Sequence, residues 1–262
     1  MKKKSLIVEI REAIAKITLN EPENLNILND SLKSQLLDVL PELDANNNIR
    51  VLILTGAGKV FCAGGDIRAF KKRYDDCIAR GEATPYYSNT LGAAILDLSK
   101  PIIAAINGAA IGGGFSLALA CDIRIASDNA FFNAGFVRVG LTPELGSSFM
   151  LPRLVGLGRA CELVMTARDI RAHEAEKIGL VNKVVGDHEL DVAASDMAKL
   201  IAAHSPIAVK MAKKALRHSL ESTLQQSLDY ETHLMTYCFS TRDHYEAVTS
   251  FLDKRKPEFK GV

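Results

Sequence analysis

The segment from Pro101 to Cys121, PIIAAINGAAIGGGFSLALAC, constrains the fold most strongly because it contains no charged side chain. Its length is close to the roughly 20 apolar residues that a helix needs to cross a bilayer, and Gly108 and Gly112 have the GxxxG spacing of helices that pair in lipid. A proline, an asparagine and three consecutive glycines are nevertheless unfavourable inside a helix. A membrane anchor is therefore less favoured than a buried strand over 102–106, a glycine turn over 107–114 and a helix over 115–121.

Composition excludes several classes of protein. The 262 residues are 48% hydrophobic and 24% charged, which is ordinary for a globular protein with a sizeable core. The net charge of +1, with both signs mixed along the chain, gives no extended positive surface for a nucleic acid. Five scattered cysteines without a CxxC pair argue against a disulfide framework and a zinc site. The N-terminus has no apolar signal core, so we expect a cytoplasmic protein without a nucleic-acid or membrane partner.

Strand and helix patterns alternate along most of the chain, which predicts α/β architecture. Apolar and polar residues alternate over 5–19, as in a β-hairpin, and the polar stretch 68–90 predicts a helix plus a mobile surface loop. Beyond about Ile201 only helical patterns occur, and we expect this tail to pack on another subunit. Further strands are expected over 51–54, 123–126 and 130–133, and helices from Asp30 or Ser31 to about 45 and over 206–221, 223–239 and 242–256.

Two glycine-rich loops can offer backbone N–H groups to an anionic oxygen. A helix that begins at Gly113 or Gly114 leaves its first N–H groups free, and without a nearby Cβ a ligand oxygen can reach them. The loop CAGGD at 62–66 can supply an opposing donor from Ala63 if both loops lie at neighbouring strand ends. Each loop alone is more simply a tight structural turn. Together they indicate an oxyanion hole.

Glu144 is the candidate acid or base. It lies in GLTPELGSS at 140–148, where Thr142 and Pro143 predict the start of a helix, a motif that on its own is usually structural. Apolar residues on both sides give this carboxylate a setting suited to proton transfer. The histidines all lie from His173 onward, outside any Ser/His/Asp or HExxH pattern, and are expected to be solvated.

A series of short motifs runs through the chain in this order: PENLN at 22–26, FCAGGD at 61–66, AINGAAIGGG at 105–114, CD at 121–122, GLTP at 140–143, LPR at 151–153 and FLDKR at 251–255. The series resembles that of the crotonase (enoyl-CoA hydratase/isomerase) superfamily, over essentially the whole chain. The motifs are highly specific to the superfamily and much less specific to one of its reactions.

The resemblance implies a spiral of ββα units over 1–200, followed by a helical region over 201–262 that builds homotrimers, often paired into hexamers. It also implies an acyl-CoA thioester substrate whose carbonyl oxygen lies between the N–H groups of Ala63 and Gly113. Coenzyme A is then part of the substrate, and neither a separate cofactor nor a metal is expected. The implied substrate-binding residues are Gly64, Gly65, Asp66, Ile67, Gly112, Phe136, Leu141, Phe251 and Lys254, the last two serving CoA held by a neighbouring subunit.

Two departures from the family pattern bear on the reaction. Hydratases of the superfamily carry two glutamates that hold and activate water, and at those positions this chain has Ser116 and Phe136. In the isomerase branch one acidic residue follows the proline of a Gly-Leu-x-Pro motif, which is the place of Glu144. The sequence that follows Glu144, with Phe149 after two serines, also looks like that of the 3,2-enoyl-CoA isomerases. We therefore expect an enoyl-CoA delta isomerase with Glu144 as its acid and base.

Other functions remain alternatives at this stage. On the same scaffold they are an enoyl-CoA hydratase, a ring-modifying acyl-CoA isomerase, and an aryl-CoA dehalogenase. The last is disfavoured because the chain has no tryptophan and no histidine before His173. From another class come a non-catalytic acyl-CoA-binding pseudoenzyme and an RNA-binding member, and near-neutral charge argues against the second.

Overall fold

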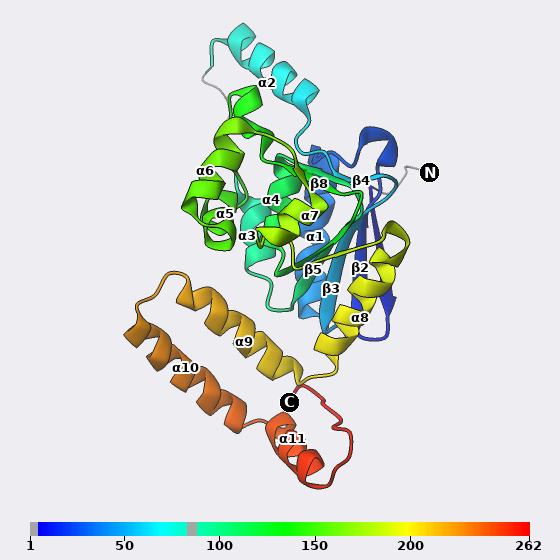
Figure 1. Cartoon of the computed structure of the whole chain (residues 1–262), viewed down its shortest axis with the longest axis vertical. Coiled ribbons are helices and arrows are strands. Elements are labelled where there is room, and N and C mark those ends of the chain that lie inside the picture. Colours follow the sequence, from blue (N-terminus) through cyan, green and yellow to red (C-terminus); the bar gives the residue numbers. More distant parts are fainter. Residues whose placement is uncertain (1–4, 83–87) are drawn as a thin grey trace.

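Two β-sheets form the framework of the computed structural model, which describes residues 5–82 and 88–262 (Figure 1). The larger sheet has the strand order β1-β2-β3-β5-β7-β10. Neighbouring strands are parallel except at one edge, where β1 pairs antiparallel with β2 in the predicted hairpin. The bounds are β1 (Leu6–Arg11), β2 (Ile14–Leu19), β3 (Val51–Gly56), β5 (Ile102–Ile106), β7 (Ile123–Ser127) and β10 (Lys183–Val185).

The smaller sheet has the order β4-β6-β8-β9. Its first three strands follow β3, β5 and β7 in the chain, and a helix comes after each pair, so the chain winds as a spiral of ββα units. The pairs β4–β6 and β6–β8 are parallel, which brings the carboxyl ends of β4 and β6 together. The predicted α/β spiral is thus confirmed. The bounds are β4 (Val60–Cys62), β6 (Ala109–Ile111), β8 (Phe131–Asn133) and β9 (Ile170–Arg171).

The uncharged segment lies inside this spiral. It forms β5, β6 and helix α4 (Gly113–Ala120), and every residue of α4 is buried. The stretch expected to be only a glycine turn contains β6, because pairing with β4 and β8 satisfies backbone groups that would otherwise be buried without partners. Within the described residues, the structure has no helix of sufficient length and apolarity to span a membrane.

Helices cover both faces of the larger sheet. Side chains of β3 alternate between them: Leu52 and Leu54 belong to the main core with α1 (Asp30–Ala45), whereas Val51 and Ile53 pack under α8 (Leu190–Ala202). The remaining elements before residue 190 are α2 (Ile67–Arg80), α3 (Thr90–Leu96), α5 (Ser147–Val155), α6 (Leu157–Thr166), α7 (Ala172–Lys177), and the 3-10 helices η1 (Pro22–Asn24), η2 (Gly135–Val139) and η3 (Asp187–Glu189).

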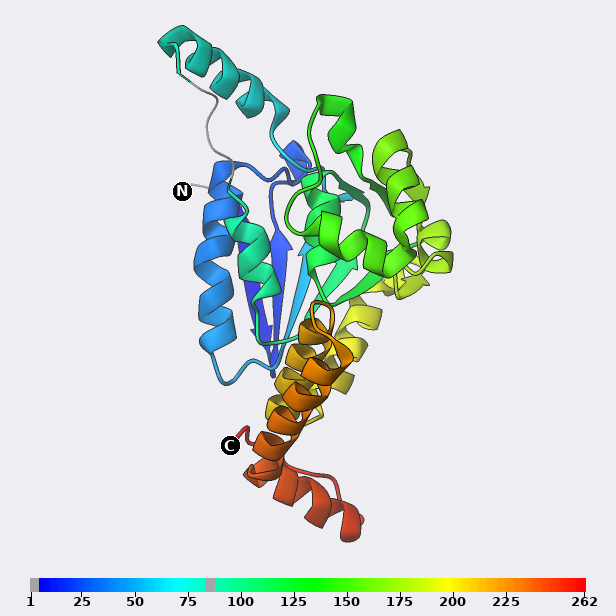
Figure 2. The same ribbon diagram turned by 90° about the vertical axis from the view of Figure 1, so that its left-hand side faces the viewer.

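The C-terminal helices extend away from the sheets (Figures 1 and 2). They are α9 (Pro206–Ser219), α10 (Leu224–Phe239) and α11 (Arg242–Leu252), which confirms the predicted helical tail, although α11 ends before residue 256. Asp122, just before β7, fastens α9 to the spiral: its carboxylate accepts hydrogen bonds from Lys213 Nζ at 2.6 Å and from Arg217 at 2.7 Å. The boundary proposed near residue 200 stays a prediction.

Two helix starts differ from the sequence prediction. Helix α1 is capped by Asn29, whose side chain accepts the N–H of Leu32 at 2.8 Å, rather than by Asp30 or Ser31. Thr142 begins no helix, because the chain stays irregular to Glu144 and α5 starts only at Ser147. The helix expected within 68–90 is α2, and part of the mobile loop predicted after it, 83–87, lies outside the described residues.

Candidate active site

The two glycine loops meet at the ends of β4 and β6, and we call this meeting point the glycine junction. A Cβ added to Gly64 would lie 2.6 Å from the carbonyl oxygen of Ile111 and 3.1 Å from the backbone nitrogen of Gly113. Gly64 also has φ +90°, a conformation that other residues rarely adopt. The predicted convergence of the loops is therefore confirmed. It depends on direct backbone contact that only glycine allows.

Helix α4 begins at this junction. Gly113 is its first residue, so the Gly113 N–H has no partner within the helix, and the positive end of the helix dipole faces the loop of β4. Next to it, a Cβ on Gly114 would overlap the carbonyl group of Cys62. This close packing holds the start of α4 against β4. It gives the predicted Gly113 donor a fixed place.

Glu144 reaches the same junction from the loop between η2 and α5. A Cβ added to Gly113 would lie 2.6 Å from Glu144 Oε1 and 3.0 Å from Leu28 Cδ1, so the carboxylate lies directly over the first residue of α4. The Glu144 side chain is half-buried. The structure thus brings together Glu144 and Gly113, which are far apart in the sequence.

Buried Cys62 is the last residue of β4, directly before the first glycine loop. Burial raises the pKa of the Cys62 thiol to about 12, and the charge of Glu144 adds to the increase. Cys62 is therefore a protonated thiol at neutral pH, which is unreactive as a nucleophile. Of these two side chains, Glu144 is the one that presents a carboxylate at the start of α4.

Ala63, the other predicted donor, already makes a backbone hydrogen bond in the structure. Its N–H donates to the carbonyl oxygen of Leu25 at 3.1 Å. Leu25 and Asn26 both have left-handed backbone angles, with φ of 55° and 51°. The buried side chain of Asn26 stabilises this turn, because its amide donates to Ala57 and Val60 carbonyls at 2.9 and 2.7 Å. Asn26 belongs to the PENLN motif, whose residue types alone do not indicate this structural role.

Ser116 and Phe136 are both buried near the start of α4. Ser116 is 0% exposed, and its hydroxyl has no hydrogen-bond partner among the described residues. Phe136 is 4% exposed, and its ring lies 3.9 Å from a Cβ placed on Gly112. An apolar ring and an isolated hydroxyl therefore occupy the places where the resemblance puts carboxylates in hydratases.

The remaining predicted substrate-binding residues divide into two groups. Gly65, Asp66 and Ile67 follow the junction, where Asp66 caps α2 by accepting the N–H groups of Arg68 and Ala69, and Ile67 is 54% exposed. Leu141 is also exposed, on the loop that leads to Glu144. The structure does not bring Phe251 and Lys254 to the junction of the same chain: Phe251 lies on α11 and Lys254 just beyond it, at the far end of the molecule (Figure 1).

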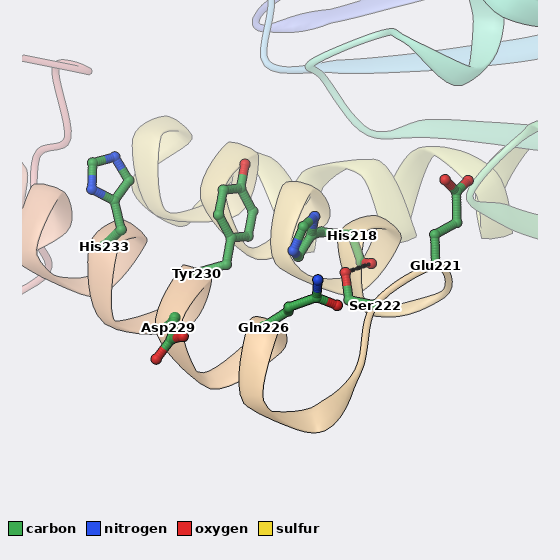
Figure 3. Close-up of a pocket in the computed structure, with 7 residues that line it drawn as sticks. All are labelled: His218, Glu221, Ser222, Gln226, Asp229, Tyr230 and His233. Carbon is green, nitrogen blue, oxygen red and sulfur yellow. Dashed lines mark hydrogen bonds between the residues drawn. The ribbon is translucent and has the colours of Figure 1, made fainter.

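A polar cleft lies elsewhere, between α9 and α10. Its volume is about 600 Å³, and the rings of His218 and Tyr230 are 4.2 Å apart within it (Figure 3). His218 and His233 are exposed, as predicted for these histidines. No group of three or more His, Cys, Asp or Glu side chains among residues 5–82 and 88–262 is placed to hold a metal ion. The cleft contains none of the residues at the glycine junction.

Comparison with known proteins agrees with this geometry. A sequence model of the family described as enoyl-CoA hydratase/isomerase matches residues 9–262. The chain is 40% identical over 259 residues to the short-chain-enoyl-CoA hydratase of Clostridium acetobutylicum, covering 98% of both, and 38% identical over 260 residues to the crotonyl-CoA hydratase of Syntrophomonas wolfei, covering 97% of both. The crystal structure of enoyl-CoA hydratase from Bacillus anthracis matches with a TM-score of 0.90 at 36% identity, over 98% of this chain and 100% of that one. The chain therefore belongs to the enoyl-CoA hydratase/isomerase family, the crotonase superfamily.

Proposed function

We propose that the protein is an enoyl-CoA isomerase that moves a double bond from position 3 to position 2 of the acyl chain. The observation that carries the proposal is the place of Glu144, whose carboxylate lies over Gly113 at the start of α4. Ser116 and Phe136, both buried, stand at the two positions where the family's hydratases carry the glutamates that activate water.

The proposed reaction needs only one proton carrier. The Glu144 carboxylate takes a proton from C2, and the electrons of the C–H bond pass into the thioester to form a dienolate. The carboxylic acid then returns the proton to C4, which leaves the double bond between C2 and C3. No atom is gained or lost, and no co-reactant is needed.

The negative charge of the dienolate falls on the thioester oxygen. In this proposal Gly113 and Ala63 donate their N–H groups to that oxygen, and one such donor typically contributes about 3 to 4 kcal/mol to the barrier reduction. Ala63 already donates to Leu25 O, so the thioester oxygen would share or replace this acceptor when substrate binds. Gly64, Gly65, Asp66, Ile67, Gly112, Phe136 and Leu141 are proposed to contact the substrate around these donors.

A second candidate is an enoyl-CoA hydratase, because similar proteins, including those of Clostridium acetobutylicum and Syntrophomonas wolfei, are called hydratases. Hydration needs a water molecule held between proton-exchanging groups. The hydroxyl of Ser116, which has no hydrogen-bond partner in the described part of the chain, neither takes up nor releases a proton at neutral pH, and the side chain of Phe136 is a hydrocarbon ring. These residues favour the isomerase over the hydratase.

The test compares two substrates. Purified protein is incubated with cis-3-hexenoyl-CoA and separately with trans-2-hexenoyl-CoA, while conjugated thioester absorbance is followed and products are identified by mass. We expect conjugation to appear with the first substrate and no water adduct with the second. A rapid water adduct would favour the hydratase, and no reaction in either case would contradict both candidates.

The variant Glu144→Gln separates chemistry from binding. It keeps the size of the side chain and removes the proton carrier, so isomerisation should fall by about 1,000-fold while the fold is retained. Glu9→Gln, at an exposed position of β1, serves as the matched control. A Glu144→Gln protein that retains most of its activity would rule out Glu144 as the acid and base.

We also propose that the chain assembles as a homotrimer or a hexamer. The C-terminal helices carry large exposed apolar side chains, including Leu224 at 77% and Phe251 at 83%. Because Phe251 and Lys254 lie far from the glycine junction of their own chain, their proposed contact with CoA would be made in a neighbouring subunit. Sedimentation velocity gives the number of chains directly.

A further inference from the structure

The backbone that carries Glu144 is held by helix α3. Leu145, the next residue, has a left-handed φ of 52°, which is unfavourable for a leucine, yet its side chain is buried. Such a conformation persists only where the surroundings hold it. Two residues of α3 and its cap, Asn89 and Gly92, contact residue 145.

Asn89 stands at the N-cap position of α3 but does not cap its own helix. Its side-chain oxygen instead accepts the N–H of Leu145 at 3.2 Å, from a position 56 residues earlier in the chain. Asparagine at a helix start usually accepts an N–H of the first turn. Here the side-chain oxygen of Asn89 accepts a hydrogen bond from the loop that carries Glu144 instead.

Gly92, three residues further along α3, allows the same loop to come close. A Cβ on Gly92 would lie 2.7 Å from Leu145 Cα and 3.0 Å from Leu145 C. Both neighbours are backbone atoms, which cannot move aside as a flexible side chain would. The glycine therefore sets how near residue 145 lies to α3.

The same peptide unit is also held by the first residue of α5. The Glu144 carbonyl accepts hydrogen bonds from the Ser147 N–H at 3.0 Å and from the Ser147 hydroxyl at 2.7 Å. The carbonyl and the N–H of the peptide bond between residues 144 and 145 are thus both held by hydrogen bonds. Of these two sets of hydrogen bonds, the one from the cap of α3 comes from a distant part of the sequence.

We propose that Asn89 and Gly92 are positioning residues that hold Leu145, and through it set the place of the Glu144 carboxylate over Gly113. This inference rests on the proposed role of Glu144 as acid and base. Neither residue touches the reacting carbons. They act through the backbone of residue 145.

The test measures kcat and KM for cis-3-hexenoyl-CoA together with amide hydrogen exchange at Leu145. Asn89→Ala should speed this exchange and lower kcat about 10-fold with KM changed less than about twofold, since a small misplacement of a catalytic group lowers turnover. Asn89→Asp keeps the oxygen acceptor and should restore kcat to within about threefold of the parent protein. Gly92→Ala, where it folds, should lower kcat about 100-fold.

Ala93→Gly is the matched control, because Ala93 is exposed on the same helix and glycine weakens α3 without touching residue 145. It should leave kcat and Leu145 exchange unchanged. The inference is overturned if Asn89→Ala speeds exchange without lowering kcat, if Asn89→Asp is as impaired as Asn89→Ala, or if Ala93→Gly has the same effect. If the parent protein does not isomerise, the proposed function fails. Hydrogen exchange at Leu145 then tests the inference by itself. Unchanged exchange in Asn89→Ala overturns it, and faster exchange supports it.

Discussion

The glycine junction and the C-terminal helices use opposite kinds of packing. At the junction, Gly64 and Gly114 let backbone touch backbone, and every residue of α4 is buried. In α9 to α11, the helices contact one another and the spiral along one side and leave Leu216, Leu224 and Phe251 more than two-thirds exposed. The difference indicates that the junction has one permitted geometry, whereas the C-terminal region has apolar surface left for further contacts.

The largest effect is expected from Gly114→Ala. The added methyl group would overlap the backbone carbonyl of Cys62, so β4 and α4 must separate, at more than about 3 kcal/mol in the free energy of unfolding. Urea unfolding measures the loss. The control is Gly158→Ala in α6, where a Cβ meets nothing within 4 Å. Equal stability of the two variants would contradict the rigid junction.

The second largest loss of stability is expected from removing the Asp122 carboxylate, which connects α9 to the spiral. In Asp122→Ala, Lys213 and Arg217 lose their shared partner while largely buried, and we expect a loss of about 2 to 3 kcal/mol. Burial already lowers the pKa of Lys213. Thermal unfolding and proteolysis between α8 and α9 provide the measurement. A variant as stable and as resistant as the parent would mean that α9 is held by other contacts.

Gly113→Ala should separate activity from stability. Its methyl group would press on the ends of the Glu144 and Leu28 side chains, which can move, and would meet the Gly64 backbone at an ordinary contact distance of 3.7 Å, so stability should change by less than about 1 kcal/mol. Displacing Glu144 and blocking the donor should nevertheless lower the isomerisation rate about 100-fold. Activity close to that of the parent would place the reacting carbons elsewhere.

Buried thiols should make the core sensitive to alkali. Burial raises the pKa of Cys62 and of Cys121 from 9.0 to about 12, so the folded chain keeps protons that the unfolded chain releases. Stability is therefore complete below pH 9 and falls between pH 9 and 12, by about 1 kcal/mol for each thiol at pH 10. Urea unfolding of Cys62→Ala at pH 8 and pH 10 should show a smaller decrease than in the parent protein. An equal decrease would contradict this origin.

The smallest effect on the single chain is expected on the face of α10 formed by Leu224, Leu228 and Met235. These exposed side chains recur at helical spacing, and replacing Leu224 and Leu228 by serine should change the unfolding free energy of one chain by less than about 0.5 kcal/mol. Self-association measured by sedimentation should weaken nonetheless. Tyr237→Ser, on the opposite face, is the control. If both variants associate as the parent does, this face takes no part in assembly.

Much of the fold could be predicted from the sequence because it depends on local pattern. Alternation in 5–19 predicted β1 and β2, and the uncharged segment predicted buried β5 and α4. The glycine loops and Glu144 could be named as candidates by residue type and motif order. The helix start at Thr142 was predicted wrongly because Thr-Pro-Glu has good capping chemistry, whereas tertiary contacts keep Glu144 irregular and α5 begins at Ser147.

By itself, the sequence determined the class of fold, the family and the absence of carboxylates at Ser116 and Phe136, since these follow from residue identity and order. Only the tertiary structure decided that Glu144 lies over Gly113, that Ala63 donates to Leu25, and that Asn89 and Gly92 contact Leu145. The physical reason is that these contacts join backbone atoms and side chains separated by 30 or more residues. No local propensity encodes their distances, which arise when parallel strands and close-packed helices bring the loops together.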